Sequence, residues 1–153
     1  MREILFRGKR SDNGEWIIGS LMRVIYENDI DGYVITDINF EKKDNGALAP
    51  KLGVFVPSYT IGQFTGLFDK NGNRIFEGDI IRQIFEEDGE KSEEIDIVLW
   101  SDSRDGDGVG WRKLHHDGST TPLWSPGSEW EIIGNIFDNP NPELLGGDED
   151  GLS

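Results

Sequence analysis

The sequence contains no cysteine. A disulfide framework, a zinc–thiolate site and a cysteine nucleophile are therefore excluded together. Long apolar runs are also missing, because no window approaches the roughly 18 consecutive apolar residues of a membrane span. The opening MREILFRGKR has basic residues but no apolar stretch of signal-peptide length. We therefore expect no membrane association and a cytoplasmic location, with which the absence of cysteine agrees.

Basic residues are few in this chain. It has 15 lysines and arginines against 30 aspartates and glutamates, a formal net charge of −15. Such a charge repels phosphate backbones and lacks the basic surface usual in nucleic-acid-binding proteins. High net charge by itself keeps a protein dispersed. The alternative is that the acidic surface meets a basic partner, or imitates nucleic acid to occupy a DNA-binding protein.

Turn residues are abundant, whereas sustained helical periodicity is scarce. Short apolar runs alternate with Gly, Asn, Asp and Pro, and the chain of 153 residues has 20 glycines and five tryptophans. This pattern predicts an all-β, mainly β fold with little helix. The length fits one domain, which we place at residues 1–145. Residues 146–153, rich in Gly, Asp and Glu, are expected to form a disordered acidic tail.

Short β runs bounded by turn residues predict the strands. The first two form a hairpin across Ser11-Asp12-Asn13-Gly14, since Asn and Gly tolerate positive φ. Residues 41–49 are polar and contain glycine, so we expect a mobile loop there. The predicted strands are residues 3–7, 15–21, 33–35, 54–56, 63–68, 74–76, 79–85, 95–100, 109–114 and 130–137.

A strongly acidic stretch connects the predicted strands at residues 79–85 and 95–100. Its carboxylates face a single lysine, Lys91, and their mutual repulsion predicts a solvated, extended hairpin tip. The functional alternative is an electrostatic docking feature. The carboxylates are Glu86, Glu87, Asp88, Glu90, Glu93, Glu94 and Asp96.

Three blocks of sequence stand out: MREILFRGKR at the start, TIGQFTGLFDKNGNRIFEGDII at residues 60–81 and EWEIIGNIFDNPNPELL at residues 129–145. In this order they resemble the YopX family of phage and prophage proteins. The resemblance implies an all-β fold of several short, bent and coiled sheets, encoded by a phage or prophage in a bacterial host. It implies no reaction. The end carries an extra Asn-Pro pair at residues 139–142, and residues 101–126 match no part of the family.

The central block also has a physical interpretation of its own. Asn71-Gly72 supplies a turn, and Asp79 can hydrogen-bond backbone amides where the next strand begins. We therefore assign these residues to folding and keep Asp79 as a candidate binding residue only.

The sequence contains no complete metal-binding or catalytic motif. Asp102, Asp105 and Asp107 suggest a calcium loop, but neither register places oxygen ligands at the positions that an EF-hand requires. His115 and His116 point to opposite faces if they lie on a strand, so they cannot share one metal ion. No serine or phosphate-binding motif accompanies them. We predict no catalytic residue, no metal and no cofactor.

Five tryptophans offer aromatic surface. Aromatic residues in a small β protein mostly fill the core, which we expect for Trp16, Trp100 and Trp130. Trp111 and Trp124 flank the polar stretch, and we take them as the exposed pair and as candidate binding residues.

These observations favour a non-enzymatic accessory protein that binds an unknown protein partner, including copies of itself. The alternative is a small β-barrel module that engages nucleic acid within a larger assembly. A third, weaker alternative is an enzyme built on carboxylates. Sheet edges in small β proteins must be covered or paired, so we expect a homo-oligomer. Light scattering that gives the 17.2 kDa of one chain over a wide concentration range would contradict this expectation.

Binding to duplex DNA is expected to be absent or very weak at physiological salt. Affinity for DNA comes from cations that replace condensed counterions, and a net charge of −15 opposes the approach. A local patch of Arg2, Arg7, Lys9 and Arg10 would need its side chains on one face, but strand alternation separates Arg2 from Arg7. An anisotropy titration with mixed-sequence duplex checks this. Micromolar binding that weakens as salt rises would place the nucleic-acid alternative first.

Overall fold

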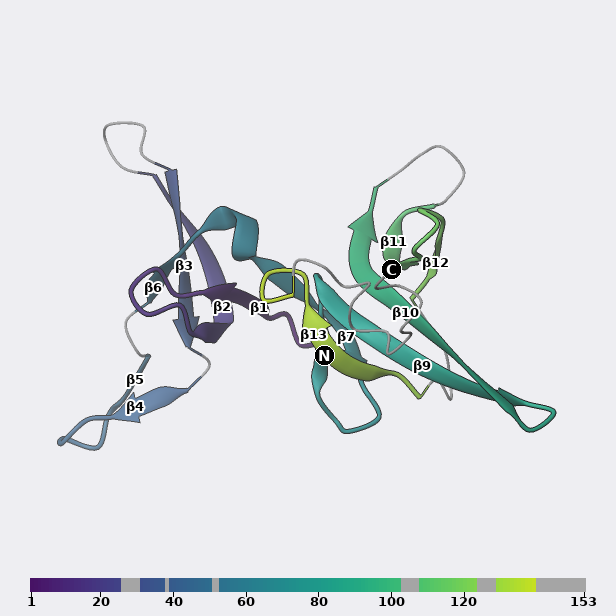
Figure 1. Cartoon of the computed structure of the whole chain (residues 1–153). Coiled ribbons are helices and arrows are strands. Elements are labelled where there is room, and N and C mark those ends of the chain that lie inside the picture. The colour runs from purple at the N-terminus through teal and green to yellow at the C-terminus, as the bar shows by residue number, and fades with distance from the viewer. Residues whose placement is uncertain (26–30, 38, 51–52, 103–107, 124–128, 140–153) are drawn as a thin grey trace. The chain divides into compact units, whose positions relative to one another are not determined.

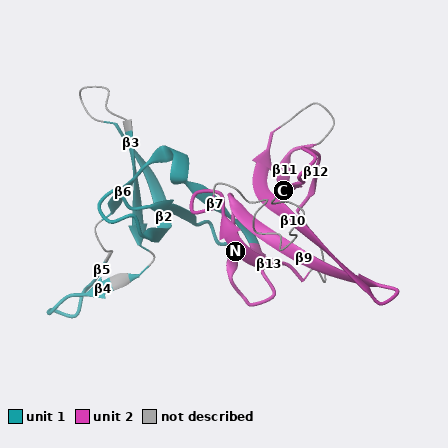
Figure 2. Cartoon of the chain, viewed as in Figure 1, with its two compact units in different colours: residues 1–66 teal, residues 67–153 magenta. Residues whose placement is uncertain are grey.

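The computed structural model describes residues 1–25, 31–37, 39–50, 53–102, 108–123 and 129–139 (Figure 1). Strands make up 60% of the described residues and helix 3%, in several antiparallel sheets, none of which is closed within that part of the chain. These values confirm the all-β prediction. The chain divides into two compact units, residues 1–66 and 67–153 (Figure 2). The single domain expected over residues 1–145 stays a prediction, and the expected tail at 146–153 lies outside the described residues.

Unit 1 is built on an antiparallel sheet with the strand order β6-β3-β2-β1-β7. Lys9 pairs with Trp16 at the end of the predicted first hairpin. The core of this sheet contains Ile17, Ile35 and Val56. The elements are β1 (Phe6–Lys9), β2 (Trp16–Ile25), β3 (Asp31–Asp37), β4 (Phe40–Lys42), β5 (Leu48–Pro50), β6 (Val54–Val56), the 3₁₀ turn η1 (Ser58–Thr60) and β7 (Gly62–Phe68).

The sheet of unit 1 curls, so that its edge strand β6 approaches the β1–β2 turn. The amide of Ser11 donates to the carbonyl of Phe55 at 2.9 Å. The amide of Lys9 donates to Thr60 Oγ1 at 3.1 Å. Between β2 and β3 the backbones are so close that a Cβ at Gly19 would lie 1.7 Å from the Thr36 carbonyl oxygen. Only glycine fits at that position.

Strands β4 and β5 correct the expectation of a loop at residues 41–49. They pair with Glu41 opposite Ala49 and Lys42 opposite Leu48. Asn45 Oδ1 accepts the amide of Ala47 at 3.0 Å and so fixes the turn. The polar, glycine-containing stretch is therefore the turn of a hairpin, because Asn side chains stabilise tight turns locally.

Unit 2 is built on a five-stranded antiparallel sheet with the order β12-β11-β10-β9-β13. Its core cluster consists of Ile75, Ile81, Val98, Leu123 and Trp130. Strand β12 was not predicted, because a three-residue Thr-Thr-Pro run carries no alternation to detect. The strands of this unit are β8 (Arg74–Phe76), β9 (Asp79–Glu87), β10 (Glu90–Ser101), β11 (Gly110–Leu114), β12 (Thr120–Pro122) and β13 (Glu131–Asn135).

Asp69 fixes the turn between β7 and β8 and ties it to β13. Its Oδ1 accepts the amides of Asn71 at 2.9 Å and Asn73 at 2.8 Å, and its Oδ2 accepts the amide of Ile132 at 3.2 Å. Burial raises the pKa of this carboxyl, but the hydrogen bonds from Asn73, Ile132 and Asn71 outweigh that effect and hold the pKa below its ordinary value. The carboxylate therefore stabilises the fold in its charged form.

Replacing Asp69 by Asn is expected to destabilise the protein by about 2 kcal/mol at pH 7, the range for hydrogen bonds to a buried charged acceptor. The loss should be fully present above the ordinary aspartate pKa of about 3.9 and disappear as the pH falls through the lower folded value. Urea unfolding of both proteins between pH 3 and pH 7 checks this. The control is Asp44→Asn, the same change at an exposed carboxylate, expected within about 0.5 kcal/mol of wild type. A difference at Asp69 as small as at Asp44 would contradict the assignment.

Candidate functional site: an acidic arm and the polar cluster at its base

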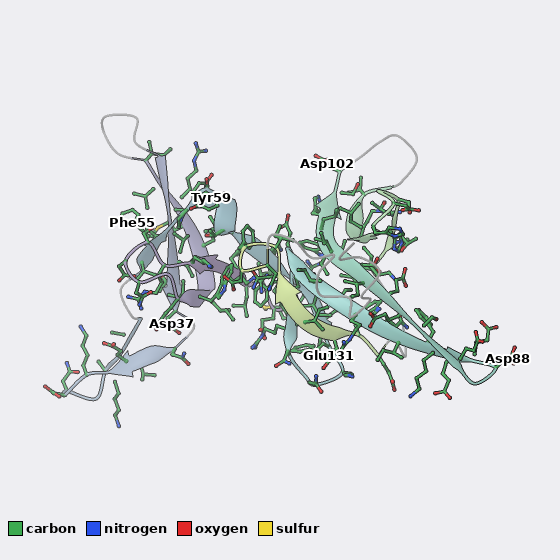
Figure 3. The ribbon with its side chains drawn as sticks, viewed as in Figure 1. Asp37, Phe55, Tyr59, Asp88, Asp102 and Glu131 are labelled. Atoms are coloured by element: carbon green, nitrogen blue, oxygen red, sulfur yellow. The ribbon has the colours of Figure 1, made fainter. Side chains whose placement is uncertain are left out.

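Strands β9 and β10 extend beyond the strands that flank them. They pair from Ile80 opposite Ile97 to Glu87 opposite Glu90. Strand β13 pairs with β9 only as far as Arg82, and β11 pairs with β10 only from Ile97 onward. Among the described strands, none flanks residues 83–94, which we call the acidic arm. Asp88 lies at its far end (Figure 3).

A two-residue turn closes the arm. Asp88 has φ 51° and Gly89 has φ 81°, as in the type I′ turns whose twist matches that of the flanking strands. The acidic connection expected from the sequence is therefore mostly paired strand, with a tip of two residues. The predicted hairpin tip is solvated as expected, but the two strands are longer than predicted, because backbone hydrogen bonds continue while the charged side chains point into solvent.

The arm combines negative charge with exposed apolar side chains. It has six carboxylates and one lysine, a net charge of −5, and every residue from 84 to 93 is exposed. Ile84 is 54% exposed and Phe85 41% exposed. Glu87 and Glu90 lie directly opposite each other, and like charges in that position destabilise a strand pair. This pair therefore lowers the stability of the arm.

The two faces of the arm differ in charge. Opposed residues in an antiparallel ladder share a face, and neighbours along a strand alternate. The register places Phe85, Glu87, Glu90 and Glu94 on one face, with no basic residue of the arm among them. We call this the Phe85 face. The opposite face carries Ile84 and the lysine.

A cluster of polar side chains lies at the base of the arm, on the face of the sheet that also carries Phe85. We call it the polar cluster. Its histidine links the neighbouring strands, because Nδ1 lies 2.7 Å from Asp96 Oδ1 and 3.0 Å from Glu94 Oε1, and Nε2 lies 2.9 Å from Thr121 Oγ1. Lys113 Nζ lies 3.6 Å from Glu94 Oε2 and 3.7 Å from Asp96 Oδ2. The members are Glu94, Asp96, Lys113, His115 and Thr121.

Burial sets the electrostatics of the polar cluster. The side chain of Asp96 is 4% exposed, and that of Lys113 is 12% exposed. Burial raises the pKa of Asp96 above its ordinary value and Glu94 adds to this effect, while the hydrogen bond from His115 and the charge of Lys113 oppose it. Lys113 also lies 5.7 Å from the ring centre of Trp130, a favourable cation–π distance. The cluster thus holds two carboxylates and two basic groups in a position that is largely buried from solvent.

The candidate binding residues chosen from the sequence lie elsewhere. Trp111 is partly buried and packs against the core of unit 2, and Trp124 lies outside the described residues. Asp79 is 1% exposed, and its Oδ2 accepts the amide of Phe76 at 2.7 Å. This bond confirms the expected contact with a backbone amide. A binding role for these three residues stays a prediction.

The expected core position of Trp100 is wrong. Trp130 is 4% exposed as expected, but Trp100 is 47% exposed. Trp100 pairs directly with Trp111 across β10 and β11, and their rings meet edge to face with centroids 5.0 Å apart. Both rings lie on the same face of the sheet. Trp111 packs against the core, and Trp100 contacts the ring of Trp111 from the solvent side. Residue type alone does not distinguish the two positions.

The polar cluster was not predicted, because the sequence pattern presents His115 only as the neighbour of His116. His115 is partly buried and His116 is exposed. The available signal was the spacing Glu94-x-Asp96, which places two carboxylates on one face of a strand. The pairing of β10 with β11 then brings the histidine to them.

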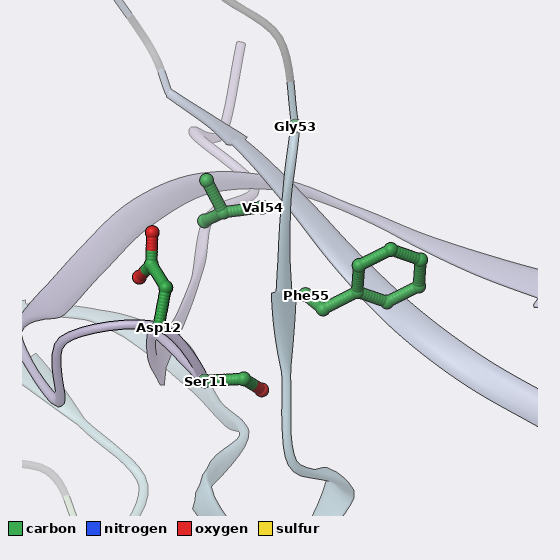
Figure 4. Close-up of a pocket in the computed structure, with 5 residues that line it drawn as sticks. All are labelled: Ser11, Asp12, Gly53, Val54 and Phe55. Atoms are coloured by element: carbon green, nitrogen blue, oxygen red, sulfur yellow. The ribbon is translucent and has the colours of Figure 1, made fainter.

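Unit 1 contains a surface pocket lined by Ser11, Asp12, Gly53, Val54 and Phe55 (Figure 4). Among these residues only Asp12 is ionisable, and its carboxylate pairs with Arg10 at 2.7 Å. An acid–base site needs convergent titratable groups. This pocket therefore gives no support to the carboxylate-enzyme alternative.

Comparison with known proteins adds the family. The family model described as YopX protein matches residues 5–145. The chain belongs to the YopX family. Protein EF1440 from Enterococcus faecalis, a crystal structure, is similar over 95% of this chain and 99% of its own, with 21% identity and a TM-score of 0.51. At this identity the likeness concerns the fold alone. None of the curated proteins compared with the chain matches it.

Membership in the YopX family confirms the resemblance of the three blocks, and the matched range also includes residues 101–126, for which no resemblance was expected. The described residues contain no helix that is long and apolar enough to span a membrane. The family's central block contains Asp69 and Asp79, whose carboxylates accept backbone amides. These residues therefore serve the fold, and the arm is the better candidate for function.

Proposed function

We propose that this YopX-family protein is a phage or prophage accessory protein that acts in the bacterial cytoplasm by binding another protein, without catalysing a reaction. The acidic arm is the binding element. The observation that supports the proposal is its unflanked position combined with exposed Ile84 and Phe85 among carboxylates. Apolar side chains surrounded by charge are typical of protein interaction sites.

The Phe85 face favours a basic partner. Phe85 contributes apolar surface at its centre, and burying one such side chain stabilises a complex by roughly 1.5–3 kcal/mol. Glu87, Glu90 and Glu94 surround it without a basic residue of the arm on the same face. Complementary charge steers association and fixes orientation more than it adds affinity. The partner therefore presents an apolar pocket bordered by lysine or arginine.

Charge also opposes the two other kinds of partner at the arm. Two arms from separate copies would repel each other, so any homo-oligomer of this protein uses another surface. Duplex DNA is repelled as well. In unit 1, Arg7 and Lys9 lie 4.8 Å and 5.6 Å from the ring centre of Trp16, which gives them an intramolecular partner. The arm therefore selects a basic protein.

The test compares two double variants that are matched in chemistry. Phe85→Ser with Glu87→Lys removes apolar surface and reverses one charge on the arm. Leu48→Ser with Glu41→Lys makes the same changes on the β4–β5 hairpin, where both residues are exposed. All four side chains are exposed, so both variants should keep the circular dichroism and melting temperature of wild type.

Wild type and both variants are used for affinity capture from infected or prophage-carrying cells, and the captured protein is then purified for titration. We expect wild type to capture a basic protein. The affinity of this protein for the arm variant should be at least about tenfold lower than its affinity for wild type, a loss of about 1.4 kcal/mol in binding free energy. The β4–β5 variant should bind as wild type does, and added salt should weaken binding. Equal affinity of wild type and the arm variant for every purified protein would contradict the proposal.

A further inference from the structure

Three side chains of the polar cluster present metal-ligand atoms to one point. Glu94 and Asp96 come from β10 and His115 from the end of β11, and one ligand atom of each lies within 4.8 Å of the other two. We propose that these three residues bind a divalent transition-metal ion of the zinc type. This site goes beyond the proposed function, with which it shares one residue, Glu94, at the base of the arm.

The orientation of the histidine supports a cation at this point. Nε2 is engaged by Thr121 Oγ1 at 2.9 Å, which leaves Nδ1 facing Asp96 Oδ1 at 2.7 Å and Glu94 Oε1 at 3.0 Å. A single proton on Nδ1 donates well to only one of two carboxylates. A divalent ion accepts lone pairs from the ring nitrogen and from both oxygens at once. Metal-ligating histidines commonly have their second nitrogen hydrogen-bonded in this way.

Lys113 leaves these ligand atoms available. Its Nζ approaches Glu94 Oε2 and Asp96 Oδ2, the oxygens that do not contact the histidine. Lys113 can therefore remain as an outer partner that orients both carboxylates while the ion takes the inner oxygens. Hydrogen-bonded outer partners of this kind position the ligands of metal sites.

The two separations between the histidine nitrogen and the carboxylate oxygens require only a small adjustment to hold zinc. Zinc binds nitrogen and oxygen at about 2.0–2.2 Å in tetrahedral geometry, so its ligand atoms lie roughly 3.3 Å apart. The observed separations of 2.7 Å and 3.0 Å must open by about half an ångström. The side chain of Glu94 is 33% exposed and can move, while Asp96 and His115 are held by the sheet. Three protein ligands leave the fourth position for water.

The ligand types determine which ions compete. Imidazole suits zinc, copper, iron and nickel, whereas magnesium and calcium prefer oxygen ligands throughout. We therefore expect zinc to bind in preference to magnesium or calcium. Cobalt(II) should occupy the same position and report its geometry by visible absorption.

The experiment titrates untagged protein with ZnCl₂ by calorimetry. We expect one ion per chain, and at least about tenfold weaker binding in His115→Ala and Glu94→Gln, since even outer-partner changes cost 10–100-fold. His116→Ala, the exposed neighbour, is the matched control and should bind zinc as wild type does. Zinc should also raise the melting temperature of wild type and of the His116 variant, but not that of the His115 and Glu94 variants.

Circular dichroism establishes that each variant is folded. Glu94 is partly exposed, so Glu94→Gln should remain folded. If His115→Ala unfolds, zinc binding by the Glu94 variant still tests the proposal. No saturable zinc binding, or equal binding by the His115, Glu94 and His116 variants, would overturn the proposal. The arm variant Phe85→Ser with Glu87→Lys should retain zinc binding, so failure of the metal site and failure of the arm proposal are distinguishable.

Discussion

The pairing of β9 with β10 is the interaction on which unit 2 depends. Ile80, Ile81 and Val98 on these two strands are all at most 1% exposed, and every other strand of the five-stranded sheet joins the pair at one side or the other. An isolated two-stranded hairpin is marginal in water. The buried half of this hairpin therefore holds the exposed half in place, and the arm is a direct extension of the core ladder.

Carboxylates have different roles in this chain because their burial differs. Asp69 and Asp79 are buried, and their oxygens accept backbone amides at turns. Asp96 is also buried, but its partners are side chains, His115 and Lys113. The carboxylates at the tip of the arm are exposed to solvent. The 30 carboxylates behind the net charge of −15 thus include groups that serve the fold, groups of a candidate metal site and groups of a candidate docking surface.

Much of the fold was predictable from the sequence, because strands and turns have local signals. Apolar runs identified the positions of β6, β7 and β8, and Asn71-Gly72 identified the turn before β8. The β4–β5 hairpin was missed and the two strands of the arm were predicted too short, because backbone pairing can include residues whose side chains are polar or charged. The exposure of Trp100 depends on its neighbour Trp111, a contact that only the strand register creates.

The candidate site was less predictable than the fold. The acidic stretch was recognised as a possible docking feature, but its two faces follow from the register of β9 and β10. The polar cluster combines residues separated by 19 positions, Asp96 and His115. Such a combination has no sequence motif, because the spacing is set by the connection between β10 and β11 and not by the chemistry.

The central claim is that the arm carries the binding surface, and hydrogen–deuterium exchange tests it most directly. Exchange would be followed in the full chain, alone and with the purified basic partner. Amides on the unflanked edges of residues 83–94 have no described strand beside them, so they should exchange rapidly in the free protein. The account predicts that the partner slows exchange in the arm and leaves the β4–β5 hairpin unchanged. Protection that spares the arm and appears elsewhere in the chain would contradict it.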